Sequence, residues 1–396
     1  MQQQKWPSER KTYKDSLSGV TVEQLTNHFA HSYHTYFTNN GWFGEDNRFL
    51  LFCSDRGNSE NLYALDLTSG EMERLTDFTS YDDTSLQAAF INPLGNEAYF
   101  IANGTIQCLH LETKERSELL NLQKGWNFSN VSCTADGKRI VFAQVEDLSE
   151  QIATNLGSGY AGFEEIEKAR PMSKICMLDL ESGELEIILE RKRWIGHVNA
   201  SPTRPELISF CHEGPWDQVD HRIWVMDIHE RLPKKIREGA DNEYAGHEYW
   251  YADGETIGYH GYTESLDQAE GKLLGYTSYD NSFKEEFHFP YQNMHIHSND
   301  ATFIIGDGQQ ASAYHGETYK DCIFIWKRIG EKMEGPRILC KHRGSFHSQK
   351  VHVHPRFSPD STYVLFTSDK DGYGNIYKVQ VPEFDTLPGV PASTTI

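Results

Sequence analysis

The chain has 396 residues and a formal net charge of −21 at pH 7, because 58 acidic side chains outnumber 37 basic ones. This surplus of negative charge argues against a nucleic-acid partner, whose phosphates require a basic surface. No run of about 18 apolar residues could cross a bilayer, and the opening segment MQQQKWPSERK lacks the apolar core of a secretory signal. The sequence therefore predicts a cytoplasmic protein with no nucleic-acid or membrane partner.

The number and spacing of the cysteines are typical of a protein in a reducing compartment. All seven stand singly, mostly beside apolar residues, and no C-x-x-C pair suggests zinc. We expect them to be small buried hydrophobic side chains rather than disulfide partners.

The predicted elements are short strands, and the first is GVTVEQLT at residues 19–26. Two further runs, FLLFCSD from Phe49 and NLYALDL from Asn61, precede SGEMERLT at residues 69–76. The same order returns in RIVFAQV, KICMLDL and SGELEIILE, and it begins again near the end with TYVLFTSD. These runs are rich in β-branched and aromatic residues and are bounded by Gly, Asp and Asn, which indicates strands.

The strands recur as a repeated unit. Turn residues equivalent to Asp360 fall at Asp46, Leu94, Asp136, Thr203, Asp253 and Asp300. Successive differences between these positions are 48, 42, 67, 50, 47 and 60 residues. Periods of this length are typical of four-stranded propeller blades or of another stacked repeat. The longest interval contains a G-x-G-x-x-G pattern at residues 157–162, which we interpret as an insertion because no parallel βαβ unit follows it.

We predict an all-β fold, a seven-bladed β-propeller of four-stranded blades. The last repeat lacks a fourth strand, because the chain reaches a Pro/Thr tail at residues 383–396. Residues 19–26 resemble the fourth strand of the first repeat, so this N-terminal strand is expected to complete the last blade and close the ring. Closure removes exposed sheet edges. Because no blade buries its faces without its neighbours, we expect residues 1–396 to form a single domain.

Four histidines occupy nearly the same place in four successive repeats. His197, His247 and His354 lie six residues before the turn residue of their repeat, and His295 lies five residues before Asp300. These positions open the innermost strands, so the imidazoles should gather at one mouth of the ring, where propeller ligands bind. Hydrogen bonding to the next blade is the alternative role, but the recurrence in four repeats favours a site.

The segment QKVHVHP at residues 349–355 indicates a metal site. On a strand, His352 and His354 would point the same way about 7 Å apart, close enough to meet one ion. Gln349 could add its amide oxygen, and His295 could supply a third imidazole. Three nitrogens and an oxygen suit manganese, nickel, cobalt or zinc.

The loop FCHEGPWDQVDHRIW at residues 210–224 is expected at the same mouth as the histidines. Arg222 there could clamp a carboxylate, although a solvated loop position is the commoner fate of an arginine. In GHEYW, His247 would be an unligated imidazole nearby and a natural general base, because its ordinary pKa lies near neutrality.

Together with HTYFTNNGWF at residues 34–43, these motifs resemble the oligogalacturonate lyases, cytoplasmic seven-bladed propellers of pectin catabolism, over the full length of the chain. The resemblance implies β-elimination of short saturated or unsaturated galacturonides, chiefly digalacturonates, to 5-keto-4-deoxyuronate (5-dehydro-4-deoxy-D-glucuronate). It implies Mn2+ held by His295, Gln349, His352 and His354. It also implies His247 as the base and Arg222 as its companion. The first ligand aligns with either His295 or His297.

The chemistry suits the residues, because removing the proton at C5 of a uronate builds negative charge on the adjacent carboxylate, which a metal or an arginine can stabilise. His197 would contact substrate or bond to the neighbouring blade. A metal hydrolase on the same mouth and a non-catalytic binding scaffold are the alternatives. The acidic oligosaccharide is the expected partner, and either a monomer or a homodimer is compatible with the sequence.

Overall fold

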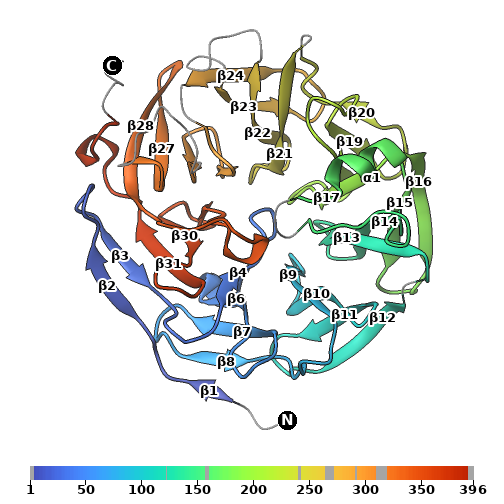
Figure 1. Ribbon diagram of the computed structural model, residues 1–396, viewed down its shortest axis with the longest axis horizontal. Coiled ribbons are helices and arrows are strands. Elements are labelled where there is room, and N and C mark those ends of the chain that lie inside the picture. Colours follow the sequence, from blue (N-terminus) through green and yellow to red (C-terminus); the bar gives the residue numbers. More distant parts are fainter. Residues whose placement is uncertain are drawn as a thin grey trace.

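The computed structural model describes residues 4–121, 123–156, 160–239, 242–263, 272–289, 292–308 and 319–390. In these residues the strands form seven antiparallel sheets arranged one after another around a common axis (Figure 1). This arrangement confirms the predicted seven-bladed β-propeller.

The first three blades occupy the N-terminal part of the chain. The first contains β4 (Ser32–His34), β5 (Trp42–Phe43), η1 (Glu45–Asn47), β6 (Phe49–Ser54), β7 (Asn61–Asp66), β8 (Met72–Arg74) and, at its outer edge, β1 (Lys5–Trp6). The second contains β9 (Thr84–Ile91), β10 (Glu97–Ala102), β11 (Thr105–His110) and β12 (Arg116–Asn121). The third contains β13 (Trp126–Cys133), β14 (Arg139–Glu146), β15 (Met172–Asp179) and β16 (Leu185–Lys192).

The next three blades continue the ring in chain order. The fourth contains β17 (Ile195–Ala200), β18 (Leu207–His212), β19 (Ile223–Asp227) and β20 (Lys234–Lys235). The fifth contains β21 (Glu243–Trp250), β22 (Thr256–Thr263), β23 (Lys272–Ser278) and β24 (Lys284–Phe289). The sixth contains β25 (Ile296–His297), β26 (Phe303–Gly306), β27 (Cys322–Ile329) and β28 (Lys332–Lys341).

The last blade joins the two ends of the chain. Its sheet order is β2 (Lys11–Lys14), β3 (Thr21–Gln24), β31 (Asn375–Gln380), β30 (Tyr363–Ser368) and β29 (Arg356–Phe357). Strand β3 pairs with β31 through Val22 opposite Val379 and Gln24 opposite Tyr377. The prediction that the N-terminal strand completes the last blade is therefore confirmed. Two short 3-10 helices flank this part of the chain, η2 (Gln349–Val351) and η3 (Phe384–Thr386).

The longest interval between repeats is an insertion in the third blade. Strands β14 and β15 are antiparallel neighbours, so the segment between them cannot be the crossover of a parallel βαβ unit. It contains the short helix α1 (Phe163–Ala169). Residues 157–159 of the G-x-G-x-x-G pattern lie outside the described residues. Among those described, no helix has the length and apolar composition needed to span a bilayer.

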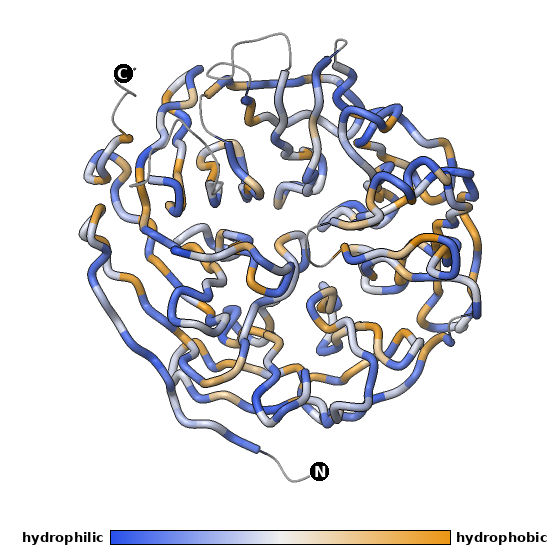
Figure 2. The backbone as a smooth tube through the Cα atoms, in the orientation of Figure 1, coloured by the Kyte–Doolittle hydropathy of each residue, from blue (hydrophilic) through white to orange (hydrophobic). Residues whose placement is uncertain are grey.

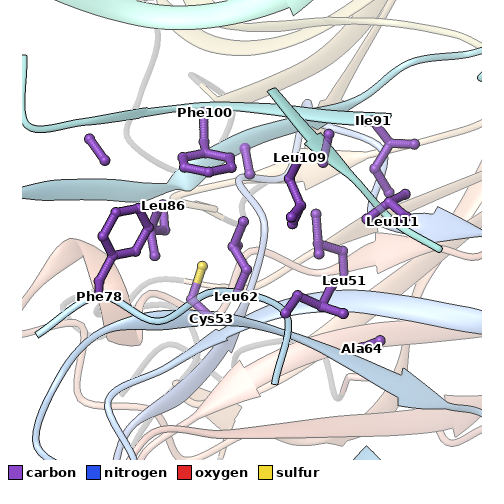
Figure 3. Packing of buried hydrophobic residues seen from close by; sticks show 14 of the residues in the cluster. Leu51, Cys53, Leu62, Ala64, Phe78, Leu86, Ile91, Phe100, Leu109 and Leu111 are labelled. Carbon is purple, nitrogen blue, oxygen red and sulfur yellow. The ribbon is translucent and has the colours of Figure 1, made fainter. Parts of the chain in front are cut away.

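Adjacent blades hold together by packing apolar faces against each other. Between the first two blades, Leu51 and Leu62 face Phe100 and Leu109, and all four are fully buried (Figure 3). Burying a side chain of this size contributes roughly 1.5–3 kcal/mol. Hydrophobic stretches are correspondingly spread around the whole ring (Figure 2). The seven cysteines are all unpaired and buried within this packing, as expected.

Candidate active site

The predicted site residues meet at one end of the ring axis. A cavity of about 560 Å³, here called the mouth pocket, is lined by His197, Arg222, His247, His295 and Gln349 among others. These residues come from the fourth, fifth, sixth and last blades, and His352 and His354 adjoin the pocket through His295. The structure thus brings together every side chain that the sequence placed at this mouth.

Three of the four histidines that occupy the equivalent place in their repeats have the same backbone distortion, which determines the direction of their side chains. His197, His247 and His354 have left-handed backbone conformations, with φ of 48°, 51° and 43°. His197 and His247 lie where the pairing register of the innermost strand shifts, between Gly196 and Asn199 and between Gly246 and Tyr249. A bulge of this kind redirects a side chain, and non-glycine residues adopt positive φ only when their surroundings hold them there. His295 lies one residue outside the register and lacks this conformation.

His295, His352 and His354 form a compact histidine cluster. Each offers one nitrogen, and these three nitrogens lie within 4.8 Å of one another. The rings of His295 and His354 are 4.1 Å apart between centroids. Nδ1 of His352 and Nε2 of His354 are buried without a hydrogen-bond partner. Buried polar atoms are nearly always paired, so two orphaned imidazole nitrogens side by side are suited to a cation.

His297 lies apart from the histidine cluster. Its Nδ1 accepts a hydrogen bond of 3.3 Å from the backbone N–H of Phe357, and its ring stacks on Tyr249 at 5.2 Å. Of the two candidates for the first ligand, only His295 shares the geometry of His352 and His354.

A buried carboxylate orients His295. Nδ1 of His295 donates to Asp307 at 2.7 Å, and Asp307 also accepts the backbone N–H groups of Met294 and His295. Such a carboxylate partner fixes the tautomer of a metal-binding imidazole and leaves its other nitrogen available. Burial lowers the pKa of His295 to about 3 and that of His352 to about 4, so both rings are neutral near pH 7.

The prediction that His352 and His354 lie on a strand is wrong. His352 and His354 lie in an irregular segment between η2 and β29, where Pro355 has no N–H to donate to a ladder. His352 is extended and His354 left-handed, and their rings are 5.5 Å apart between centroids. Gln349 begins η2 and lines the mouth pocket, where its Nε2 donates to the hydroxyl of Tyr160 at 3.2 Å.

The opposite side of the mouth pocket is built from ion pairs. Arg222 is 5% exposed, and its NH1 donates to Glu213 at 2.9 Å. Its Nε lies 3.6 Å from a carboxylate oxygen of Glu248, which is completely buried. Nε2 of His197 lies 3.1 Å from the other oxygen of Glu213. Burial lowers the pKa of His197, but the hydrogen bond to Glu213 and the negative charges of Glu213 and Glu248 together outweigh burial and leave that pKa above its ordinary value.

His247 lies between the two sides. Its ring is 5.3 Å from His295, and its Nδ1 is 2.8 Å from Nε2 of His260. Burial, together with the nearby His260, His295 and Arg222, holds the pKa of His247 well below its ordinary value. The ring is therefore neutral and can accept one proton at the ring nitrogen that carries no hydrogen. Nε2 of His260 also lies 3.1 Å from the backbone carbonyl oxygen of Met294, to which it can only donate.

Sequence reasoning missed three residues of the site. Asp307, His260 and Glu248 stand behind His295, His247 and Arg222, respectively. Each lies on a strand, or directly after one, among apolar neighbours. The only signal in the sequence was a charged or titratable residue where a core position is expected.

A closed propeller with a neutral imidazole, a histidine cluster and a buried arginine in one pocket has the features of a propeller enzyme. The family description that matches is "Oligogalacturonate lyase", and the match covers residues 2–385. The chain therefore belongs to the oligogalacturonate lyase family of carbon–oxygen lyases, which confirms the resemblance seen in its motifs.

Individual relatives agree with this assignment. The chain is 27% identical over 387 residues to an oligogalacturonate lyase of Dickeya dadantii, covering 94% of this chain and 96% of the relative. It is 26% identical over 393 residues to an oligogalacturonide lyase of Pectobacterium atrosepticum, with the same coverage of 94% and 96%.

Two solved structures share the fold. The crystal structure of oligogalacturonate lyase from Vibrio parahaemolyticus matches with a TM-score of 0.85 and 26% identity, over 97% of this chain and 99% of that one. An oligogalacturonate lyase in complex with manganese matches with a TM-score of 0.85 and 24% identity, over 96% and 98% of the two chains.

Proposed function

We propose that this enzyme cleaves short oligogalacturonates, chiefly digalacturonates, by β-elimination to 5-keto-4-deoxyuronate during pectin breakdown. The observation that carries the proposal is the position of His247. It is a neutral imidazole 5.3 Å from His295 of the histidine cluster, and it lines the mouth pocket together with Arg222.

His295, His352, His354 and Gln349 would hold a divalent cation. The orphaned nitrogens of His352 and His354, and the Asp307 carboxylate that fixes His295, suit such an ion. We propose manganese, because a structural relative is an oligogalacturonate lyase in complex with manganese. When bound, the cation would draw electron density from the uronate carboxylate and so make the adjacent C5 proton more acidic.

The base in this proposal is the unprotonated ring nitrogen of His247. It takes the C5 proton, the C5–H electron pair becomes the C4–C5 double bond, and the glycosidic oxygen leaves C4 with its bonding pair and takes up a proton. The 4,5-unsaturated monouronate released from a digalacturonate then opens its ring at the hemiacetal C1, and the resulting enol ketonises to 5-keto-4-deoxyuronate. His260 holds the ring of His247 through the 2.8 Å contact at Nδ1. A positioned base of this kind contributes about 10²–10⁴-fold to the rate.

Arg222 supplies positive charge for the acidic substrate. Its guanidinium is held between Glu213 and Glu248 and lies over the ring of Trp216, 5.6 Å from its centroid. This support fixes the orientation of the guanidinium before substrate arrives, which is the condition for electrostatic stabilisation without reorganisation. His197, hydrogen-bonded to the same Glu213, would contact a neighbouring group of the sugar.

The geometry gives no support to a two-carboxylate glycosidase. Among the described residues that line the mouth pocket, Glu213 is the only acidic one, and it is ion-paired to Arg222, as is the adjacent Glu248. Neither is therefore available as the paired acid and base of hydrolysis.

Absorbance with saturated digalacturonate tests the proposal. Elimination creates a double bond conjugated with a carboxylate, which absorbs near the ultraviolet edge, whereas hydrolysis creates none. We expect this absorbance to rise with the purified enzyme, to stop after chelation, and to return with added manganese. Reducing-sugar release without the absorbance would instead indicate a hydrolase, and no cleavage at all would indicate a binding scaffold.

A further inference from the structure

A second cavity lies at the other end of the ring axis. It has a volume of about 320 Å³ and is bordered by residues at the turns between first and second strands, including Pro202, Ala252, Asn299 and Pro359. The mouth pocket is instead bordered by residues before or within the first strands, such as Trp194 and Met294. We call the second cavity the turn-side pocket. Its size lies at the lower end of the range for small-molecule sites, roughly 300–1,000 Å³.

Phe37 separates the two pockets. It lies in the loop after β4, which reaches toward the middle of the ring in Figure 1. Its ring stacks on His354 at 5.7 Å and lies 5.5 Å from His295, and it also lines the turn-side pocket. Tyr36, the preceding residue, lines the mouth pocket. The two cavities therefore lie back to back, and the turn-side pocket is not part of the active site.

The turn-side pocket is positively charged in a strongly negative protein. The chain carries a formal net charge of −21, yet no aspartate or glutamate lines this pocket among the described residues. The one charged residue in that part of its wall is Arg356.

The charge of Arg356 has no acidic partner in the part of the chain that the structure describes. Its NH1 donates to the backbone carbonyls of Phe37, at 2.9 Å, and of Asn39, and its guanidinium lies over Trp42 at 5.5 Å. Within the described residues, Nε and Nη2 make no other hydrogen bond, so they remain donors of a side chain that lines the pocket. An enclosed cation without a counter-ion is costly, and a bound carboxylate would offset that cost through charge-assisted hydrogen bonds.

The remaining wall favours a hydroxylated ring. Oδ1 of Asn199, a side chain that is 4% exposed, lines the pocket without a hydrogen-bond partner, so it needs a donor such as a ligand hydroxyl. The partly exposed rings of Trp250 and Phe90 lie in the same wall and offer apolar faces to the C–H side of a sugar.

We propose that the turn-side pocket binds a single-ring uronate, with its carboxylate on Arg356 and a hydroxyl on Asn199. The inference is independent of the reaction proposed for the mouth pocket, because it rests only on the wall of the turn-side pocket.

Calorimetric titration of the manganese-loaded enzyme with D-galacturonate tests it. Ala252→Phe adds a ring at the exposed rim of the turn-side pocket and leaves the mouth pocket unaltered. The difference between the wild-type and Ala252→Phe isotherms therefore reports only the turn-side pocket. We expect the wild type to bind one additional equivalent, while both proteins cleave digalacturonate at the same rate.

Further titrations identify the chemical group that the turn-side pocket recognises. D-Galactose, which lacks the carboxylate, should bind the turn-side pocket at least tenfold more weakly. Arg356→Met should cause a loss of at least tenfold, and Arg356→Lys a smaller loss because it keeps the charge but not the planar fork. Identical wild-type and Ala252→Phe isotherms, or equal binding of galactose, would overturn the proposal. Should Arg356→Met not fold, these two comparisons still decide it.

Discussion

The mouth pocket has two sides that handle charge in opposite ways. On one side, His295, His352 and His354 are neutral, and two of their nitrogens have no partner. On the other, Arg222 is enclosed by Glu213 and Glu248, and His197 shares Glu213.

The difference shows which side of the mouth pocket depends on a bound ligand. The histidine cluster leaves polar atoms unsatisfied and so is incomplete without a cation. The ion-paired side also has buried atoms without a hydrogen-bond partner, Nε of Arg222 and both carboxylate oxygens of Glu248, but these belong to groups of opposite charge 3.6 Å apart, so they compensate each other within the chain. Metal content should accordingly respond to changes on the first side, and stability to changes on the second.

The largest effect is expected from the histidine cluster. His352→Ala removes one of three converging nitrogens, so the protein should lose both bound manganese and turnover of digalacturonate. Elemental analysis after gel filtration, together with the absorbance assay, measures the two losses. A variant that retains full metal content would contradict the assignment of His352.

Replacing the base separates chemistry from metal binding. His247→Ala should lower turnover by about 10²–10⁴-fold, because it removes the positioned proton acceptor between His295 and Arg222, while metal content stays at the wild-type level. The same elemental analysis provides the check. Equal metal loss in His247→Ala and His352→Ala would remove the distinction between base and ligand.

The ion-paired side should govern folding stability. Glu248→Gln leaves Arg222 with one carboxylate in a buried setting, so we expect the free energy of unfolding to fall by about 3 kcal/mol. Glu186→Gln is a matched control, because Glu186 pairs with Arg231 on the surface, where both side chains are 43% exposed. Its effect should stay below about 1 kcal/mol in urea titrations. Similar losses in both variants would show that burial of the Arg222 pairs is unimportant.

Acid should destabilise the site through His260. Burial lowers the pKa of His260 from 6.5 to about 3, so between these values the unfolded chain binds a proton that the folded protein does not. Stability therefore falls as pH drops below 6.5, by at most about 1.4 kcal/mol per pH unit for this group. Melting temperatures at pH 7.5 and pH 5.0 should differ less in His260→Gln than in the wild type. Parallel pH profiles would exclude this contribution.

The smallest effect is expected at His197. His197→Ala removes one contact to Glu213 and to the sugar, so KM should rise about tenfold, or about 1.4 kcal/mol, with kcat within a few-fold of wild type. Steady-state kinetics on digalacturonate measure both. An unchanged KM would leave His197 with only its bond to Glu213.

The sequence predicted the fold well because the repeat is regular. Strands such as Asn61–Asp66 and Tyr363–Ser368 lie where their β-branched and aromatic composition and their flanking turn residues indicated, and the missing fourth strand of the last repeat led to the N-terminal strand. The gathering of His197, His247 and His295 followed from their nearly equivalent places in the repeat, and that of Arg222 from its loop between the second and third strands.

Other features depend on three-dimensional packing that a single sequence does not display. The irregular path of His352 and His354 arises beside Pro355, and the left-handed bulges at His197 and His247 appear only once neighbouring strands pair. Asp307 is 12 residues from His295 in the chain, yet it reaches His295 because β25 and β26 pair. No local spacing reports such a contact.

The pairing of Val22 with Val379 has a consequence for how the protein is made. During synthesis the opening strand must wait for more than 300 residues before its partner leaves the ribosome. Contacts between such distant residues form slowly. The last blade therefore forms late in folding. Proteolytic removal of either terminal strand would open the ring between β3 and β31 as well as shorten one sheet.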